Sequence, residues 1–202
     1  MDRRKAAGFG GVLAGGLGAA GLVQGFLIEP FRVALVEFEV PLHQLPREFD
    51  GVKVLQLSDL HFRQRPRLQG RLLALASRSA PDLVVITGDL IDREADMDPC
   101  LAFLAELHDR TQAPVVTVPG NWEHRIFPTK ADIARWYGRV RGEGRAAVLV
   151  NESVRLRRGD ALLWLVGTDD PYFGHADLAA SFDGVPDNAC ALVLTHAPEA
   201  FE

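Results

Sequence analysis

A carboxylate and an imidazole stand two residues apart just after residues 53–58, a segment with the pattern of a strand. In an extended chain, residues two apart point to the same side, so we expect Asp59 and His61 to converge. A carboxylate oxygen and an imidazole nitrogen that meet at one point are typical ligands of a divalent metal ion. Metal binding is therefore the first chemistry that this sequence indicates.

Three further polar stretches follow apolar runs of strand length. In open α/β sheets, ligands bind outside the carboxyl ends of the strands, so four such ends would surround one site. The side chains offer oxygen and nitrogen but no sulfur, which suits Mn, Fe, Zn, Co or Mg. Gly88 and Gly120 would let neighbouring loops approach closely. The three stretches are Gly88-Asp89-Leu90-Ile91-Asp92, Gly120-Asn121-Trp122-Glu123-His124 and Thr195-His196-Ala197-Pro198.

Each stretch alone also has an ordinary structural interpretation. Asp59 and His61 could lie in a surface turn, and Asp89 could cap a helix. Asn121 could simply tolerate a left-handed turn, and His196 could be a hydrogen-bonded core histidine. The occurrence of all four in this order, each at a strand end, favours a shared site.

Strand and helix patterns alternate along the part of the chain that must position these residues. Period-two or continuous apolar runs predict strands, and the intervening segments have helical periodicity with Thr129 as a candidate N-cap. A later run of short strands with tight turns completes the pattern. It predicts an α/β fold with two stacked, mixed β-sheets flanked by helices. Strands are expected at 32–40, 53–58, 83–89, 113–121 and 190–198, three more within 147–170, and helices at 67–80, 98–109 and 129–140.

Composition limits the class of protein. A chain of 202 residues favours one domain with a full core. It has 22 basic and 27 acidic residues, a net charge of −5, which gives no support for a nucleic-acid partner. The two cysteines, Cys100 and Cys190, have no spacing that pairs them, so a disulfide framework is not expected.

The N-terminus differs from the rest of the chain. Residues 6–28 carry no charge and a single polar side chain, Gln24, and they follow the basic cluster Arg3-Arg4-Lys5. At about 1.5 Å per residue, this segment is long enough to cross a hydrocarbon core of roughly 30 Å. We expect residues 1–30 to form a membrane anchor, with a cleaved export signal and a buried core helix as alternatives. The positive-inside rule would then place the domain at 31–202 outside the cytoplasm.

The four polar stretches together resemble the calcineurin-like metallophosphoesterase superfamily. Asp59, Asp89, Asn121 and His196 are separated by 30, 32 and 75 residues, an order and spacing typical of that superfamily. The apolar N-terminal segment and Gly-Thr-Asp-Asp-Pro at 167–171 are similar to its membrane-associated bacterial phosphodiesterase branch of the YaeI and YkuE type. The resemblance implies an αββα sandwich.

The resemblance also implies two divalent metal ions and a role for each matching residue. Asp59 and His61 would bind the first ion, Asp89 would bridge both, and Asn121 and His196 would bind the second. Such a centre activates water against a phosphodiester or pyrophosphate bond. A membrane anchor would suit a lipid-linked or envelope substrate such as UDP-diacylglucosamine.

Two further residues complete the predicted site. Asp92 would orient a metal ligand. Trp122 stands where the superfamily usually has a histidine that assists the leaving group, so His124, two residues later, is the candidate to replace it.

The chain departs from the superfamily pattern a second time at its end. It stops at Glu202, before the Gly-His-x-His stretch that supplies two more histidine ligands in the superfamily, and we expect the domain to be incomplete at its C-terminus. The two departures keep open a catalytically degenerate metal-binding or scaffolding protein at the membrane. A pure membrane-interaction module is disfavoured, because attachment needs none of the four stretches.

Overall fold

The computed structural model describes residues 33–42 and 44–201. The chain falls into two compact units, Met1–Glu37 and Phe38–Glu202, and every helix and strand described below lies in the second. The anchor predicted within residues 1–30 lies outside the described residues. Among the residues that are described, no helix is both long and apolar enough to span a bilayer.

The strand predicted at 32–40 is not formed in its described part. Residues 33–40 carry neither helix nor strand, and Val36 and Phe38 are largely exposed. The alternation of apolar residues alone cannot make a strand, because a strand also needs a hydrogen-bonded neighbour. No strand of the described chain pairs with this segment.

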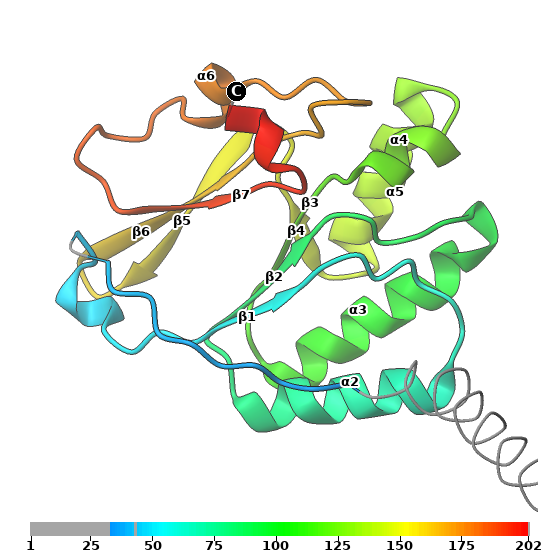
Figure 1. The fold of residues 1–202 in the computed structure, drawn as a ribbon, viewed down its shortest axis with the longest axis horizontal. Coiled ribbons are helices and arrows are strands. Elements are labelled where there is room, and N and C mark those ends of the chain that lie inside the picture. Colours follow the sequence, from blue (N-terminus) through cyan, green and yellow to red (C-terminus); the bar gives the residue numbers. More distant parts are fainter. Residues whose placement is uncertain (1–32, 43, 202) are drawn as a thin grey trace, which may run out of the picture. The chain divides into compact units, whose positions relative to one another are not determined.

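The first sheet has the strand order β1-β2-β3-β4, and all three pairings are parallel (Figure 1). Helices connect successive strands, as parallel pairing requires. The carboxyl ends of these strands therefore lie along one edge of the sheet. The strands are β1 (Val54–Leu57), β2 (Leu83–Thr87), β3 (Val115–Val118) and β4 (Ala146–Val148), and the helices are α2 (Pro66–Ser79), α3 (Met97–Thr111), α4 (Asn121–Ile126) and α5 (Lys130–Gly142).

The second sheet is mixed. β5 (Glu152–Arg158) and β6 (Ala161–Gly167) form an antiparallel hairpin, and β6 pairs in parallel with β7 (Ala191–Leu194). The short helix α6 (Leu178–Ser181) lies between β6 and β7 in the chain. The predicted fold class of two stacked sheets with flanking helices is confirmed. Both sheets were predicted to be mixed, but the described strands of the first are all parallel, because a helix connects each strand to the next.

Strand β2 shows how the layers are held together. All five of its residues are buried, as its continuous apolar run predicts for a strand covered on both faces. Val84 and Ile86 pack into the cluster that includes residues of α2, α3 and α5. Leu83 and Val85 point the other way and pack with Leu165 and other residues of the second sheet. Figure 1 shows the same order, with helices α2, α3 and α5 on one side of β1–β4 and strands β5–β7 on the other.

Helix boundaries test the capping predictions. The Thr129 hydroxyl accepts a hydrogen bond from the Asp132 N–H at 3.2 Å, which confirms Thr129 as the N-cap of α5. Helix α3 begins at Met97, one residue before the predicted start at Asp98. Helix α4 was not predicted, because its six residues are too few for an apolar period to appear. Three 3-10 helices complete the described elements: η3 (Arg47–Phe49), η4 (Glu94–Asp96) and η5 (Pro198–Phe201).

Candidate metal centre

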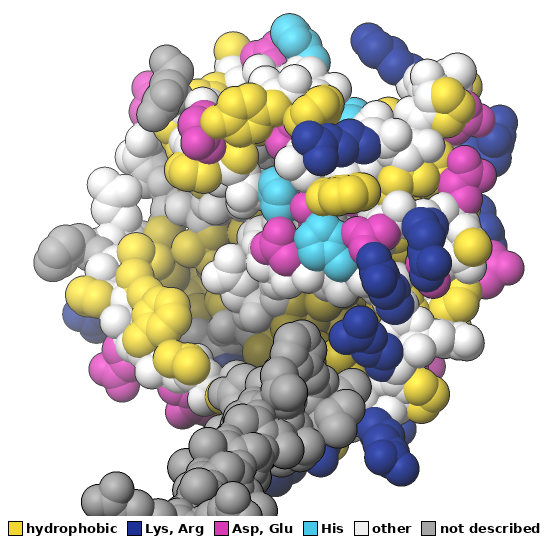
Figure 2. Space-filling model, turned by 45° about the vertical axis from the view of Figure 1, so that its right-hand side comes forward, with side chains coloured by type: hydrophobic (Ala, Val, Ile, Leu, Met, Phe, Trp, Pro, Cys, Tyr) yellow, Lys and Arg dark blue, Asp and Glu magenta, His cyan; other side chains and the backbone are white. Residues whose placement is uncertain are grey.

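Loops after β1, β2 and β7 bring four of the predicted ligands together. The Oδ2 atom of Asp89 lies 3.6 Å from Nε2 of His61 and 3.5 Å from Nε2 of His196. Nε2 of His61 is also 3.8 Å from Oδ1 of Asp59. Asp59, His61 and Asp89 each offer a ligand atom, and these atoms all lie within 4.8 Å of one another. Figure 2 shows the histidine and acidic side chains gathered in the middle of one face.

Three of these residues adopt a left-handed backbone conformation. The φ angles of Asp59, His61 and Asp89 are 51°, 37° and 54°. Non-glycine residues in this region cost about 1–3 kcal/mol each and cluster at functional sites. Backbone hydrogen bonds from the Asp59 N–H to the Gly88 carbonyl and from the His61 N–H to the Asp89 carbonyl, at 3.3 and 2.9 Å, hold the two loops together.

Two glycines allow this close approach. Gly88 has φ 90°, and a Cβ there would lie 2.7 Å from Nδ1 of His196 and 2.8 Å from Cα of Gly120. A Cβ on Gly120 would overlap the Asp89 carboxylate. The prediction that these glycines let the strand-end loops approach closely is confirmed, since any side chain at either position would push the loops apart.

The two histidines are oriented through their Nδ1 atoms. His61 Nδ1 lies 2.5 Å from Asp92 Oδ1, and His196 Nδ1 lies 2.8 Å from the Thr87 carbonyl oxygen. A carbonyl or carboxylate partner keeps the proton on Nδ1, which leaves the Nε2 lone pair free to bind a metal. In both rings it is Nε2 that faces Asp89.

Asp92 is itself held in the ionised form. Arg63 donates to Asp92 Oδ2 at 2.9 Å. Burial acts to raise the pKa of Asp92, but the hydrogen bonds from Arg63 and His61 outweigh it, and the pKa is lowered. The structure thus places Asp92 against His61, where it can orient that ring.

Asp89 is a buried carboxylate that lacks a full set of partners. Its Oδ1 accepts a hydrogen bond from the Trp122 N–H at 2.9 Å, so Oδ2 is the atom left facing the two histidines. Burial raises the pKa of Asp89, against the opposing effects of the Trp122 N–H and the two imidazoles. A buried carboxylate with two free imidazole lone pairs beside it is an environment that a cation would stabilise.

Asn121 supplies an independent observation. Its Oδ1 is buried and has no hydrogen-bond partner among the described residues. A buried polar atom without a partner is costly, and a bound cation would satisfy it. The donors present, carboxylate and amide oxygen with imidazole nitrogen, fit the divalent ions expected from the sequence.

His124 and Trp122 point in different directions. Nε2 of His124 lies 2.7 Å from Oδ1 of Asp169, and both side chains are 10% exposed. Burial acts to lower the pKa of His124, but the hydrogen bond and charge of Asp169 outweigh it, and the pKa is raised. The Trp122 ring meets the His61 ring edge to face, with centroids 5.8 Å apart.

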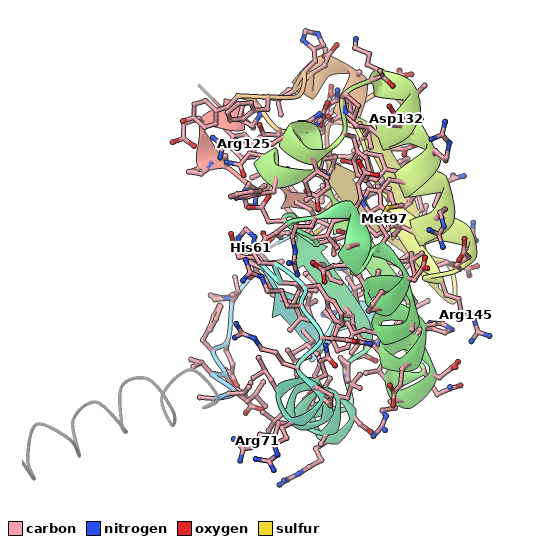
Figure 3. The ribbon with its side chains drawn as sticks, turned by 90° about the vertical axis from the view of Figure 1, so that its right-hand side faces the viewer. His61, Arg71, Met97, Arg125, Asp132 and Arg145 are labelled. Carbon is pink, nitrogen blue, oxygen red and sulfur yellow. The ribbon has the colours of Figure 1, made fainter. Side chains whose placement is uncertain are left out.

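A cation stacks beside Trp122. The guanidinium of Arg125, in α4, lies over the rings of Trp122 and Phe173, at 5.4 and 4.4 Å from their centroids. Figure 3 shows Arg125 and His61 along the same edge of the domain. The aromatic rings thus hold a positive charge next to Trp122, which lies against His61, one of the predicted metal ligands.

Sequence reasoning missed two residues that support the site. Oε1 of Glu123 accepts from the Leu90 N–H at 2.6 Å and Oε2 from the Gly120 N–H at 3.0 Å, so one buried carboxylate joins the loops after β2 and β3. Glu123 stands three residues after the N-cap Gly120 and accepts its N–H, as in one half of a capping box, but glycine lacks the Ser or Thr side chain by which the motif is recognised in a sequence. Asp169, the third residue of Gly167–Pro171, holds His124 and also accepts from the N–H of His175 at 2.9 Å.

The comparisons with known proteins agree with this geometry. Residues 52–197 match the family model described as Calcineurin-like phosphoesterase. A Bos taurus protein described as "Transmembrane protein with metallophosphoesterase domain" is 30% identical over 184 residues, which are 83% of this chain and 40% of that protein. The Bacillus subtilis (strain 168) proteins YkuE and YkoQ, both described as uncharacterized metallophosphoesterases, are 27% and 28% identical, over 99% and 73% of this chain and 71% and 53% of their own lengths.

The chain belongs to the calcineurin-like phosphoesterase family. The predicted superfamily is therefore confirmed, and the match to YkuE confirms the predicted branch. The chain spans less than half of the bovine relative's length.

The role of Glu123 in joining the two loops can be tested by Glu123→Gln. The amide nitrogen must then face one of the two backbone N–H donors, and a buried donor without a partner costs about 1–3 kcal/mol. We expect the free energy of unfolding in urea to fall by about this amount and the affinity for divalent metal to weaken. Glu106→Gln, which removes an exposed partner of Arg110, is the control and should change neither. Wild-type stability and metal affinity in Glu123→Gln would refute the role.

Proposed function

We propose that the chain is a metal-dependent phosphohydrolase whose binuclear metal centre activates water against a phosphodiester or pyrophosphate bond. One observation carries the proposal: Asp89 Oδ2 lies close to the Nε2 atoms of both His61 and His196, at 3.6 and 3.5 Å. A carboxylate oxygen that is near two imidazole nitrogens able to bind a metal suits a bridging ligand. Family membership supports the same chemistry.

The proposed roles follow from the positions of the donors. Asp59 and His61 hold one ion, and Asn121 and His196 hold the other, with Asp89 shared. The Ser58 hydroxyl donates to Asp59 Oδ2 at 2.6 Å, and this bond steadies the carboxylate whose Oδ1 faces His61. When bound, two divalent cations supply positive charge for the phosphoryl oxygens and lower the pKa of water. Asp92 acts by orienting His61.

The bridging role predicts that Asp89→Asn largely abolishes hydrolysis while the fold survives. Asparagine keeps the size of the side chain and can still accept the Trp122 N–H, but it removes the negative charge between the histidines. Because outer partners of metal ligands alone are worth 10–100-fold, we expect a loss of about 10²-fold or more in turnover, together with reduced metal content. Circular dichroism should be unchanged, and Asp183→Asn, an exposed change, is the control. Wild-type turnover with full metal content in Asp89→Asn would exclude the two-metal proposal.

The leaving-group step is proposed to proceed without strong acid assistance. Indole is a donor of very high pKa and cannot take the place of the usual histidine at Trp122. His124 is the catalytic candidate in its place, but its Nε2 is engaged by Asp169. We therefore favour substrates whose leaving group is stable without a proton, such as a pyrophosphate bond.

His124→Ala separates the two versions of this step. We expect wild type to prefer nitrophenyl over alkyl leaving groups, and His124→Ala to change the rates for both by a similar small factor. A loss of about 10²–10⁴-fold confined to the alkyl leaving group would instead make His124 the general acid. If metal-loaded wild type hydrolyses none of the monoester, diester and pyrophosphate substrates, the degenerate metal-binding or scaffolding function, which Trp122 favours, replaces the enzyme.

We propose in addition that the N-terminal segment attaches the domain to the cell membrane, on the extracytoplasmic side. The uncharged run 6–28 after three basic residues supports this, and so do the Bos taurus and Danio rerio relatives described as transmembrane proteins. A membrane location suits a lipid-linked or envelope substrate, for which UDP-diacylglucosamine is one example.

Topology can be measured with a reporter fused after Glu202. An alkaline phosphatase reporter, which works only after export, should be active in the full-length fusion and inactive in a fusion that lacks residues 1–30. A fluorescent reporter that works only in the cytoplasm should give the opposite pattern. Cytoplasmic activity of the full-length fusion would refute the predicted side.

A further inference from the structure

A pocket of about 520 Å³ adjoins the metal centre on the side of His61. Its volume lies within the range of small-molecule sites in proteins, about 300–1,000 Å³. His61, Asp92 and Trp122 form the wall next to the proposed metal ions. The rest of the lining comes from the loop after β1, the N-terminal half of α2, and Phe103 of α3. A molecule held at the metal centre could therefore extend directly into this pocket.

The floor of the pocket is apolar. Phe62 and Phe103 are buried, with ring centroids 5.3 Å apart, and Leu60 and Leu72 are half-buried against the main core. Leu68, in the first turn of α2, lines the pocket but belongs to none of the hydrophobic clusters found among the described residues. Leu68 is thus an apolar side chain at the pocket that the core does not use.

Two of the remaining lining residues, Arg63 and Arg65, are basic. Arg63 donates to Asp92, and its side chain is half exposed. Among the described residues, no carboxylate forms an ion pair with Arg65, which precedes α2. Figure 2 shows Lys and Arg side chains beside the central group of histidine and acidic residues. The whole chain has a net charge of −5, so these arginines make this region more basic than the chain as a whole. Their positive charge would attract an anion.

Uncharged hydrogen-bonding side chains are scarce in the lining. Gln69 is the one uncharged amide, and its Nε2 already donates to the Arg63 carbonyl at 3.0 Å. A sugar or a nucleobase placed here would find few uncharged hydrogen-bonding partners among the lining side chains. A hydrocarbon chain needs none.

We propose that this pocket binds the alkyl or acyl chain of an anionic amphiphilic phosphodiester. The phosphate would lie at the metal centre near Arg63 and Arg65, and the hydrocarbon chain would lie along Leu60, Leu68 and Leu72. This inference rests on the proposed phosphohydrolase function. It means that specificity depends on the substituent that stays on phosphorus after the leaving group departs.

Binding of phosphonates, which cannot be hydrolysed at phosphorus, tests the pocket without turnover. The 202-residue chain in nanodiscs is titrated calorimetrically with methylphosphonate and butylphosphonate, with empty nanodiscs as the baseline. Each buried methylene is worth about fourfold in affinity, so butylphosphonate should bind at least about tenfold more tightly. Equal affinities would overturn the inference.

Substitutions on α2 locate the effect. Leu68→Asp should remove the advantage of the butyl compound, and Leu68→Ala should reduce it. Both variants place acceptable residues in a first helical turn, where an acidic side chain is favourable. Leu75→Asp changes another half-buried leucine of α2 that lies outside the pocket and the clusters, and it should keep the advantage. Arg65→Gln should weaken both phosphonates alike. An undiminished butyl advantage in Leu68→Asp would overturn the placement.

Hydrolysis separates this inference from the function on which it rests. 4-Nitrophenyl methyl phosphate and 4-nitrophenyl butyl phosphate share a leaving group, so a kcat/KM ratio of at least about tenfold in favour of butyl is expected, and Leu68→Asp should equalise them. If both are hydrolysed equally and the phosphonates bind equally, the pocket inference is wrong and the function stands. If neither is hydrolysed but butylphosphonate binds more tightly, the function is wrong and the pocket stands.

Discussion

The site depends on one buried carboxylate. Asp89 is 3% exposed. Its backbone and that of the preceding Gly88 both have positive φ angles. Taking such a charge out of water is unfavourable unless opposite charges and donors surround it. The Trp122 N–H and the two imidazoles supply part of that environment, and a cation would supply the rest. The convergence of the loops after β1, β2, β3 and β7 is the arrangement that this one group requires.

The supports of the site come from different layers of the fold. His61 is oriented by Asp92, and both lie in loops that follow strands of the first sheet. His196 follows β7 of the second sheet, and its Nδ1 lies 2.8 Å from the Thr87 carbonyl oxygen in β2 of the first. The packing of the two sheets through Leu83, Val85 and Leu165 therefore sets the separation of the two histidines. Core packing and ligand geometry are coupled here, because interiors are too dense to shift one without the other.

The surroundings of the centre differ from side to side. On the α4 side, Glu123 accepts hydrogen bonds from two backbone N–H groups, and His124 is paired with Asp169. On the α2 side, leucine and phenylalanine side chains form an apolar recess with arginines at its edge. The polar side is suited to rigidity and the apolar side to contact with a ligand, which is the division that the proposed amphiphilic substrate requires.

Much of the fold could be predicted because it depends on short-range patterns. The continuous apolar run of β2 indicates a strand covered on both faces, and Thr129 with an N–H three residues later indicates a helix start. The residues that gather at the strand ends could likewise be predicted. The signal was the order of side chains able to bind a metal, together with Gly88 before Asp89 and Gly120 before Asn121.

Other features were decided only by tertiary structure. The alternating run 33–40 forms no described strand, because pairing depends on a neighbour that local sequence does not specify. His124 faces Asp169, 45 residues away, because the six-residue helix α4 sets the direction of its side chain. By itself the sequence determined which chemical groups this protein carries and at which strand ends they lie. The tertiary structure decided which lone pairs face one another. Backbone dihedrals and packing between distant segments set these directions, and the types of neighbouring residues fix neither the dihedrals nor the packing.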